Sequence, residues 1–392
     1  MKMGEQSYER GKLEIRLKAL TPIWTGGVQG INDCLRETGI AGSLRWWYEA
    51  IVRGLGGTAC DPCKHIHELY GKSLQQYKEA LRQGNNWWQA LDTAGLCDAC
   101  KIFGTTGWKR QFQFKIRDET RLLWEPPPDA LNVRPPDRTR GWFMSPGRVE
   151  RVVLQFTGKN EVLGQLASLF LFVEKWGTLG AKPQLGYGVF QVENREAVKS
   201  RATKWTQKDN GLPGGEDNCP DLRRFGFFRF RFRPERQNWW SWLPALERLL
   251  GRTDTARVLK KAAEEGMVPV SPVLKNEWRF NYWKGPFRIE RWLFGTSLGK
   301  ENRVRSKIGA SWAYKNGDEW EVRGWVWFPE QDKEKRLIPG EYHQQIWEAV
   351  RDVDLWCAAL KVKKGELQTW PDVELWRKWQ PDEVLSFLEG RQ

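Results

Sequence analysis

The chain has 392 residues, a length typical of two domains, and its 40% hydrophobic and 29% charged residues are those of a globular protein and exclude wholesale disorder. Lys and Arg number 63 against 49 Asp and Glu, and the resulting net charge of +14 favours a polyanionic partner. The longest strongly apolar run, 166–173, is far shorter than the ~20 residues of a membrane-spanning helix, and the first residues lack the apolar segment of a signal peptide, so we expect a cytoplasmic protein without a membrane partner.

The first half of the chain predicts six elements in the order β-α-β-β-α-β. Strands are predicted at 13–19, 112–117, 149–156 and 187–192 from alternating or β-rich patterns, and helices at 43–55 and 161–176 from apolar residues at helical spacing. Ser43 is a good N-cap for the first helix, and Gly177 ends the second. This order is the split βαβ, or ferredoxin-like, pattern.

An insertion, 56–102, separates the first helix from the second strand and carries two CxxC pairs. The four cysteines, Cys60, Cys63, Cys97 and Cys100, fit a tetrahedral site, because thiolates select zinc over hard cations. The gap between the pairs exceeds the ~15–20 residues usual for such sites, so we expect a small helical excursion around 68–82, and His65 or His67 could replace one cysteine. Four protein ligands leave no open position, which predicts structural zinc. A disulfide and four unrelated thiols are the alternatives.

A segment rich in glycine, proline and charge, 199–221, predicts a linker between domains at 1–198 and 222–392. After it, Phe228, Phe230 and Phe232 alternate with arginines, and we place these phenylalanines in the core more readily than on an RNA-binding face. Helices are expected around 245–264 and at 342–360, with Ile346, Val350, Val353 and Trp356 buried, and β-rich segments at 303–314 and 319–328.

A short repeat links the halves, since Phe-Gly-Thr at 103–105 recurs at 294–296 with basic residues following in both copies. The repeat predicts two related domains. The chain also holds 25 tryptophans, many of them beside Arg or Lys, as at 44–47 and 108–110. Basic residues interleaved with aromatic rings suit a nucleic acid strand, and arginine stacked on tryptophan inside the protein is the alternative.

A glycine-rich loop, 177–188, follows the second predicted helix and contains Lys182. Glycines permit positive φ and close approach of a ligand, and Lys182 supplies charge. The loop is not a dinucleotide fingerprint, because it leaves a helix and enters a strand. The sequence Gly71-Lys72-Ser73 is not a Walker motif either, because Ile66 stands where the upstream glycine is needed.

Four segments together resemble the RAMP superfamily of CRISPR RNA-binding proteins, and within it the first-subunit family of the type III-B Cmr effector complex. They are TPIWTGG at 21–27, IAGSLRWW at 40–47, CDACKIFGTTGW at 97–108 and GAKPQLGYG at 180–188. The resemblance covers the first half well and extends more weakly over 294–311. It departs at Ala41, where many relatives place a basic residue.

The resemblance implies an α+β fold of two tandem ferredoxin-like (βαββαβ, RRM-like) RAMP domains, the first with the Cys-rich zinc-binding insertion. It implies a non-catalytic subunit that contacts guide RNA near its 3′ end, target RNA, or both, beside other RAMP subunits. The expected RNA contacts are Arg45, Trp46, Lys109, Arg110, Gly180, Lys182, Gly186 and Gly188, with Arg303 and Arg305 in the second half. For Arg45 the alternative is an i,i+4 pair with Glu49.

Two other functions stay open. Some RAMP relatives are metal-independent endoribonucleases that process CRISPR RNA, and such cleavage commonly uses a histidine base. The chain offers His65, His67 and His343, of which two lie in the insertion and one in a predicted helix, although Tyr or Lys could replace His. The other alternative is a protein-interaction adaptor whose basic surface supports solubility.

Overall fold

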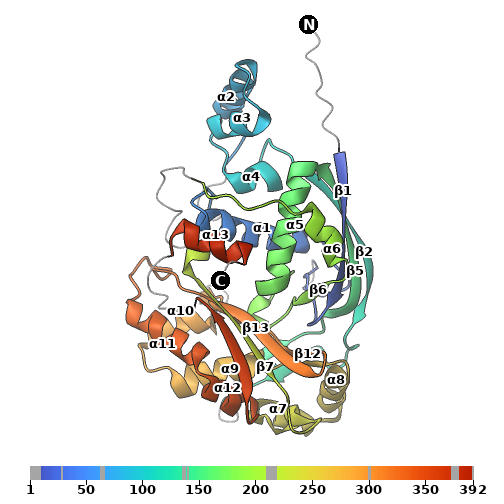
Figure 1. Cartoon of the computed structure of the whole chain (residues 1–392). Helices are drawn as coiled ribbons and strands as arrows, with labels where there is room; N and C mark the ends of the chain where they lie inside the picture. Colours follow the sequence, from blue (N-terminus) through green and yellow to red (C-terminus); the bar gives the residue numbers. More distant parts are fainter. Residues whose placement is uncertain are drawn as a thin grey trace.

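The computed structural model describes residues 10–27, 30–61, 67–134, 138, 141–208, 219–298, 302–371 and 379–390. Its first half is built on an antiparallel sheet in the order β2-β5-β1-β6 (Figure 1). The strands are β1 (Arg10–Ala19), β2 (Phe112–Leu122), β5 (Arg148–Lys159) and β6 (Phe190–Val192), and the main helices are α1 (Glu37–Gly54) and α5 (Asn160–Trp176). These six elements follow one another in the predicted β-α-β-β-α-β order.

One face of this sheet is covered and the other is open. On β1 the side chains of Leu13, Ile15 and Leu17 are buried, whereas those of Arg16 and Lys18 are exposed. The first part of strand β2 alternates in the same way, with Phe112 and Phe114 buried and Gln113 and Lys115 exposed. Apolar residues therefore face α1 and α5, and a charged surface faces solvent.

Helix α1 begins at Glu37, earlier than the predicted N-cap Ser43. Two glycines in this first part weaken the local helix signal, but Ile40 is fully buried, and at Gly39 an added Cβ would lie 2.9 Å from the Cβ of Thr25. Close packing against the loop after β1 therefore extends the helix where local propensity opposes it.

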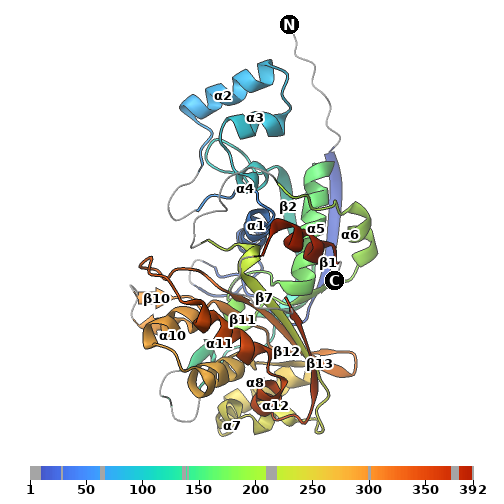
Figure 2. The same ribbon diagram turned by 60° about the vertical axis from the view of Figure 1, so that its left-hand side comes forward.

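The insertion forms α2 (Gly71–Arg82), α3 (Trp87–Thr93) and α4 (Asp98–Phe103). Helices α2 and α3 project beyond the rest of the molecule as an arm (Figure 2). A hairpin of β3 (Leu131–Val133) and β4 (Trp142–Met144) connects β2 to β5, and α6 (Arg195–Arg201) reaches into the predicted linker.

The second half holds a sheet in the order β14-β7-β13-β12-β8, with β11 also paired to β13. Its strands are β7 (Phe225–Phe232), β8 (Met267–Val268), β11 (Ile308–Ala310), β12 (Ala313–Asn316), β13 (Glu319–Trp327) and β14 (Gly365–Trp370), and a hairpin joins β9 (Thr296–Leu298) to β10 (Asn302–Val304). The helices are α7 (Pro244–Leu250), α8 (Thr253–Glu264), α9 (Ser271–Asn276), α10 (Phe287–Phe294), α11 (Gly340–Arg351), α12 (Val353–Leu360) and α13 (Pro381–Glu389), with a π-helical turn η4 (Glu277–Tyr282) after α9. The α+β class with antiparallel sheets is confirmed.

The prediction of a single helix over 342–360 is wrong, because the helix is interrupted at Asp352, which separates α11 from α12. The Asp352 carboxylate accepts hydrogen bonds from the backbone N–H groups of Asp354 and Leu355 and so caps α12. The break turns Val353 outward, and its predicted burial is wrong. Ile346, Val350 and Trp356 are buried as predicted.

Most of the described tryptophans are buried or half-buried. Trp46 of α1 lies 5.9 Å from Phe225 and 5.6 Å from Trp325, measured between ring centroids, so aromatic residues of both halves form one core. Among the described tryptophans, Trp242 stands out as exposed. Phe228, Phe230 and Phe232 are buried, which confirms their predicted place in the core.

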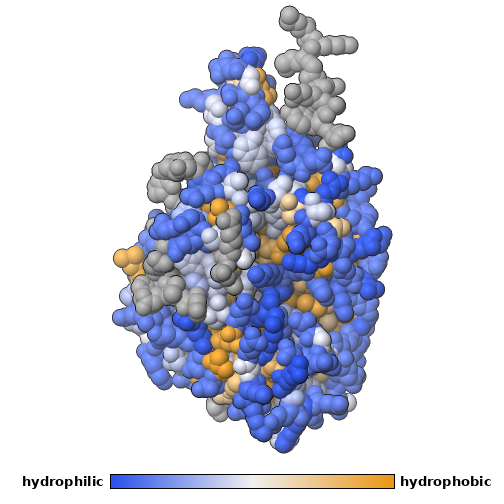
Figure 3. All heavy atoms as spheres, viewed as in Figure 1, coloured by the Kyte–Doolittle hydropathy of each residue, from blue (hydrophilic) through white to orange (hydrophobic). Residues whose placement is uncertain are grey.

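Hydrophilic residues cover most of the face seen in Figure 3. Within the described ranges, no helix has both the length and the apolar composition that a membrane crossing requires.

Candidate nucleic-acid interface and metal centre

The base of the arm carries a cluster of possible metal ligands. One ligand atom from each of Cys60, His67, Cys97 and Cys100 lies within 4.8 Å of the others. Cys60 Sγ and Cys100 Sγ are 3.5 Å apart, well beyond the ~2.05 Å of a disulfide bond. Three of the four predicted cysteines thus come together with His67. The fourth, Cys63, lies outside the described residues, as does His65.

The donor set of this cluster fits a zinc ion. Three sulfurs and one imidazole nitrogen make a common tetrahedral structural site with no open position. Cys97 also caps α4, since its sulfur accepts a hydrogen bond from the backbone N–H of Cys100 at 3.4 Å. Hydrogen bonds from the Cys100 and Cys60 side chains lower the pKa of Cys97, which favours the thiolate that a metal requires.

Arg45 connects this cluster to the turn that follows α4. Its guanidinium donates to Glu49 Oε1 at 2.7 Å, to the carbonyl oxygen of Gly104 at 3.0 Å and to Cys100 Sγ at 3.3 Å. Glu49 is buried, and the pair is the i,i+4 alternative raised from the sequence. Arg45 therefore links α1 to the turn and to the sulfur of Cys100.

The other residues predicted to contact RNA differ in their exposure to solvent. Trp46 is half-buried against the second half, and Arg110 donates to the carbonyl of Phe112 at 3.0 Å and lies over its ring. Lys109 is exposed beside the turn. In the second half, Arg303 and Arg305 are both exposed, on and just after β10.

The glycine-rich loop uses its backbone donors internally. Gly180 N–H donates to Ser43 Oγ at 2.9 Å, Ala181 N–H to the Trp24 carbonyl at 2.7 Å, and Gly188 N–H to the Pro22 carbonyl at 2.9 Å. These three amides are therefore engaged in hydrogen bonds within the protein.

The far part of the same loop is held by the second half. Trp312 donates from its backbone N–H to the Gly186 carbonyl at 3.3 Å and from Nε1 to the Leu185 carbonyl at 3.0 Å, and Lys275 Nζ donates to the Gln184 carbonyl. Gly186 has φ +86°, and an added Cβ would lie 2.7 Å from Trp312 N. Gly186 is thus required for packing between the halves.

Lys182 is the loop residue that combines charge with access to solvent. It is half-buried in a left-handed conformation, with its ammonium nitrogen 3.8 Å from the centroid of the Trp24 ring and 3.4 Å from Ser145 Oγ. Burial lowers the pKa of Lys182 to about 8. Ammonium, indole and hydroxyl thus meet at one point beside the loop.

Sequence reasoning missed Trp24 and Ser145. Trp24 stands inside the quoted TPIWTGG segment, so a signal was present, whereas Ser145 lies in the loop after β4 and carries no motif. Ser145 lies near Lys182 because the loop after β4 folds back beside the loop at 180–188.

The chain is similar to one family model and to several solved structures. The model of the RAMP superfamily matches residues 16–191. The chain is similar to Cmr1 from Pyrococcus furiosus in its apo form, at 13% identity over 94% of this chain and 100% of that chain, with a TM-score of 0.37. It is also similar to a chain in the structure of type III-B Cmr-beta bound to cognate target RNA, at 10% identity over 90% of this chain and 100% of that chain, with a TM-score of 0.41. No curated protein matches the chain. The match to the RAMP superfamily model thus lies within the first half of the chain.

Proposed function

We propose that the protein is a non-catalytic, RNA-binding subunit of a type III-B CRISPR (Cmr) complex, which contacts guide RNA near its 3′ end, target RNA, or both. The observation that carries this proposal is the pairing of Lys182 with Trp24 beside the glycine-rich loop of a RAMP-superfamily domain. The motif resemblance to the Cmr first-subunit family supports the choice of complex and the other RAMP subunits as partners.

The chemistry of this site suits a single RNA strand. The Lys182 ammonium can neutralise one phosphate, the Trp24 ring offers a face for a base, and Ser145 offers a hydroxyl for a phosphate or ribose oxygen. Exposed Lys109, Arg303 and Arg305 can add phosphate contacts next to the two related turns. None of these groups selects a base by its hydrogen-bonding edge, so base pairing with the guide supplies the sequence specificity.

The described histidines give little support to the endoribonuclease alternative. His343 is 5% exposed and packs against Phe328, and burial lowers its pKa to about 4. His67 belongs to the cysteine cluster. A general base must reach the substrate hydroxyl, and neither side chain meets that requirement.

The test is the affinity for single-stranded RNA measured against salt concentration, with the protein alone and with its partner subunits. We expect a logarithmic slope steeper than about −2, which corresponds to three or more neutralised phosphates. Replacing Trp24 and Lys182 with alanine should weaken binding, whereas Lys260→Ala, an exposed residue of α8, should not. A shallower slope in both settings contradicts the proposal, and so does specific cleavage of labelled RNA in the presence of a chelator.

A further inference from the structure

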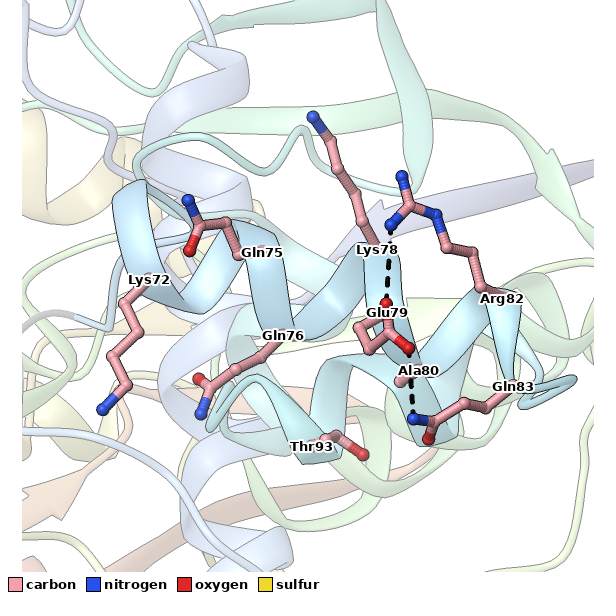
Figure 4. Close-up of a pocket in the computed structure, with 9 residues that line it drawn as sticks. All are labelled: Lys72, Gln75, Gln76, Lys78, Glu79, Ala80, Arg82, Gln83 and Thr93. Carbon is pink, nitrogen blue, oxygen red and sulfur yellow. Dashed lines mark hydrogen bonds and ion pairs between the residues drawn. The ribbon is translucent and has the colours of Figure 1, made fainter.

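The arm carries a polar groove that the motifs and the family resemblance leave unassigned. It has a volume of about 500 Å³ and lies along α2 and the adjoining end of α3 (Figure 4). Its lining residues are Lys72, Gln75, Gln76, Lys78, Glu79, Ala80, Arg82, Gln83 and Thr93. Every one of these side chains except Ala80 is exposed.

The groove face is the side of α2 that the arm turns to solvent. The opposite side holds half-buried Leu74 and Tyr77, and the centroid of the Tyr77 ring lies 5.7 Å from that of Trp108. The polar residues are thus not needed for folding of the arm, because its packing rests on the other side of the helix.

The charge of the groove is positive. It contains three cations and one carboxylate, Glu79, which accepts from Arg82 at 3.4 Å and from Gln83 Nε2 at 3.3 Å (Figure 4). Figure 4 shows Lys72 at the N-terminal end of α2 and Lys78 and Arg82 further along the helix, and all three side chains are exposed. A ligand that lies along α2 therefore meets cations over most of the length of the helix.

The ligand cluster brings together the two segments of chain that enter and leave the arm at its base. Cys60 and His67 precede α2, and Cys97 and Cys100 follow α3. Helices α2 and α3 stand away from the two sheets (Figure 2). The groove therefore lies beyond the body of the protein.

We propose that this groove binds the ribose-phosphate backbone of an RNA strand, as a contact separate from the site at Lys182. This inference rests on the proposed function. Lysine and arginine neutralise phosphates, and glutamine amides both donate to phosphate oxygens and pair with ribose hydroxyls. The lining contains no aromatic ring on which a base could stack, so binding here is independent of sequence. A small apolar ligand does not fit a lining in which Ala80 is the one apolar residue.

The main experiment removes the positive charge without altering the fold. In the full chain, Lys72, Lys78 and Arg82 are each changed to Gln, and affinity for single-stranded RNA is measured over a range of salt. Since each phosphate contact contributes about 0.7 to the logarithmic slope, we expect the slope to become shallower by about 2. All three residues are exposed, so the melting temperature and metal content should stay unchanged.

A matched control removes the same charge elsewhere. Lys260, Lys333 and Lys364 are exposed residues of the second half, and their combined change to Gln should leave the slope nearly as it is. As an independent measurement, bound RNA should protect Lys72 and Lys78 from chemical acetylation, whereas Lys260 should stay reactive.

Each outcome decides the matter. If the unaltered protein binds RNA and the arm variant behaves like the control, the inference is wrong and the proposed function stands. If the arm variant keeps its RNA affinity but no longer co-purifies with a neighbouring subunit, the groove is a protein-binding surface and the inference is again wrong. If the unaltered protein fails to bind RNA with or without its partners, the proposed function itself fails.

Discussion

The two halves of the molecule share a strand order but use their sheets differently. In the first half the order β2-β5-β1-β6 leaves one face of the sheet open to solvent. In the second half the equivalent strands lie in the order β12-β13-β7-β14, and both faces of the central strands β7 and β13 are covered. Phe228 packs on Trp278 and Trp356 of its own half, and Phe227 packs on Trp47 and Trp176 of the first half. The same strand order thus forms a sheet with a solvent-exposed face in the first half and a sheet that packs against the other half in the second.

The two related turns show the same contrast at the level of single residues. Gly104 ends α4 with φ 86° and ψ 164°, and Gly295 ends α10 with φ 85° and ψ 162°. In each case an arginine donates to the glycine carbonyl, Arg45 at 3.0 Å and Arg279 at 3.2 Å. Among the described residues, the first turn has a cluster of possible metal ligands beside it and the second has none, so the shape of the turn itself does not require a metal. The cluster of Cys60, His67, Cys97 and Cys100 instead belongs to the base of the arm.

We expect the largest effect from loss of the metal, which should destabilise the insertion in the first half and leave the second half intact. Changing Cys97 and Cys100 to Ser should abolish zinc binding, because two of four ligands are lost, and structural zinc contributes about 10 kcal/mol or more to the folding of small domains. Limited proteolysis should then cut within 56–102 while the second half stays intact. Cys357→Ser, at a half-buried position outside the cluster, is the control. Much less than one equivalent of zinc in the reduced, unaltered protein would remove the zinc assignment.

The two arginines should differ in their effect on stability. Arg45→Ala leaves buried Glu49 without its nearest partner, and breaking such a pair costs about 3–5 kcal/mol. Arg279→Ala should cost less, because Glu290 is more exposed than Glu49. Unfolding by denaturant measures both values. Adding Glu49→Gln to Arg45→Ala should recover part of the loss, and equal losses in the two single variants would contradict this contrast.

The two glycines, by contrast, should behave alike. An added Cβ would lie 2.7 Å from Arg110 N at Gly104 and 2.8 Å from Ser306 N at Gly295, both at positive φ. We expect Gly104→Ala and Gly295→Ala each to lower the free energy of unfolding by about 1–3 kcal/mol. Gly42→Ala, in open space on α1, should instead stabilise by about 0.5–1 kcal/mol. A large difference between the two turns would show that they are not structurally equivalent.

The smallest effect concerns two of the lysines in left-handed conformation, Lys182 before β6 and Lys361 before β14. Lys182→Ala should weaken RNA binding about tenfold, or about 1.4 kcal/mol, and Lys361→Ala should have less effect. The folded-state pKa of Lys182 is lowered to about 8, so its positive charge is lost as the pH rises through that value. Affinity should therefore fall between pH 7 and 9, whereas Lys182→Arg, which keeps its charge, should remove this loss. A pH profile unchanged in that variant would contradict the role of Lys182.

The sequence predicted local features well and long-range contacts poorly. Cys97 and Cys100 come together because a single helical turn fixes their spacing, but the choice of His67 depends on the path of the chain from Cys60 to α2. Glycine spacing predicted a tight loop. It could not show that the amides of this loop donate to Pro22, Trp24 and Ser43, which are far away in sequence.

The abundance of tryptophan has the same explanation. Trp46 beside Arg45 has the pattern of a nucleic-acid contact, yet its ring packs on Phe225 and Trp325. Alternation of apolar and charged residues shows which side of a strand is covered by its own domain. It does not show that a second domain covers the other side, as at Phe227.

The aromatic contacts between the halves also bear on how the chain could be divided. Cutting it within the segment at 199–221 would uncover Trp46 and Trp47 on one fragment and Phe225 and Trp325 on the other. Large uncovered apolar surfaces promote aggregation. Neither fragment is expected to survive alone, and synthesis of the second half must be complete before the first reaches its final stability.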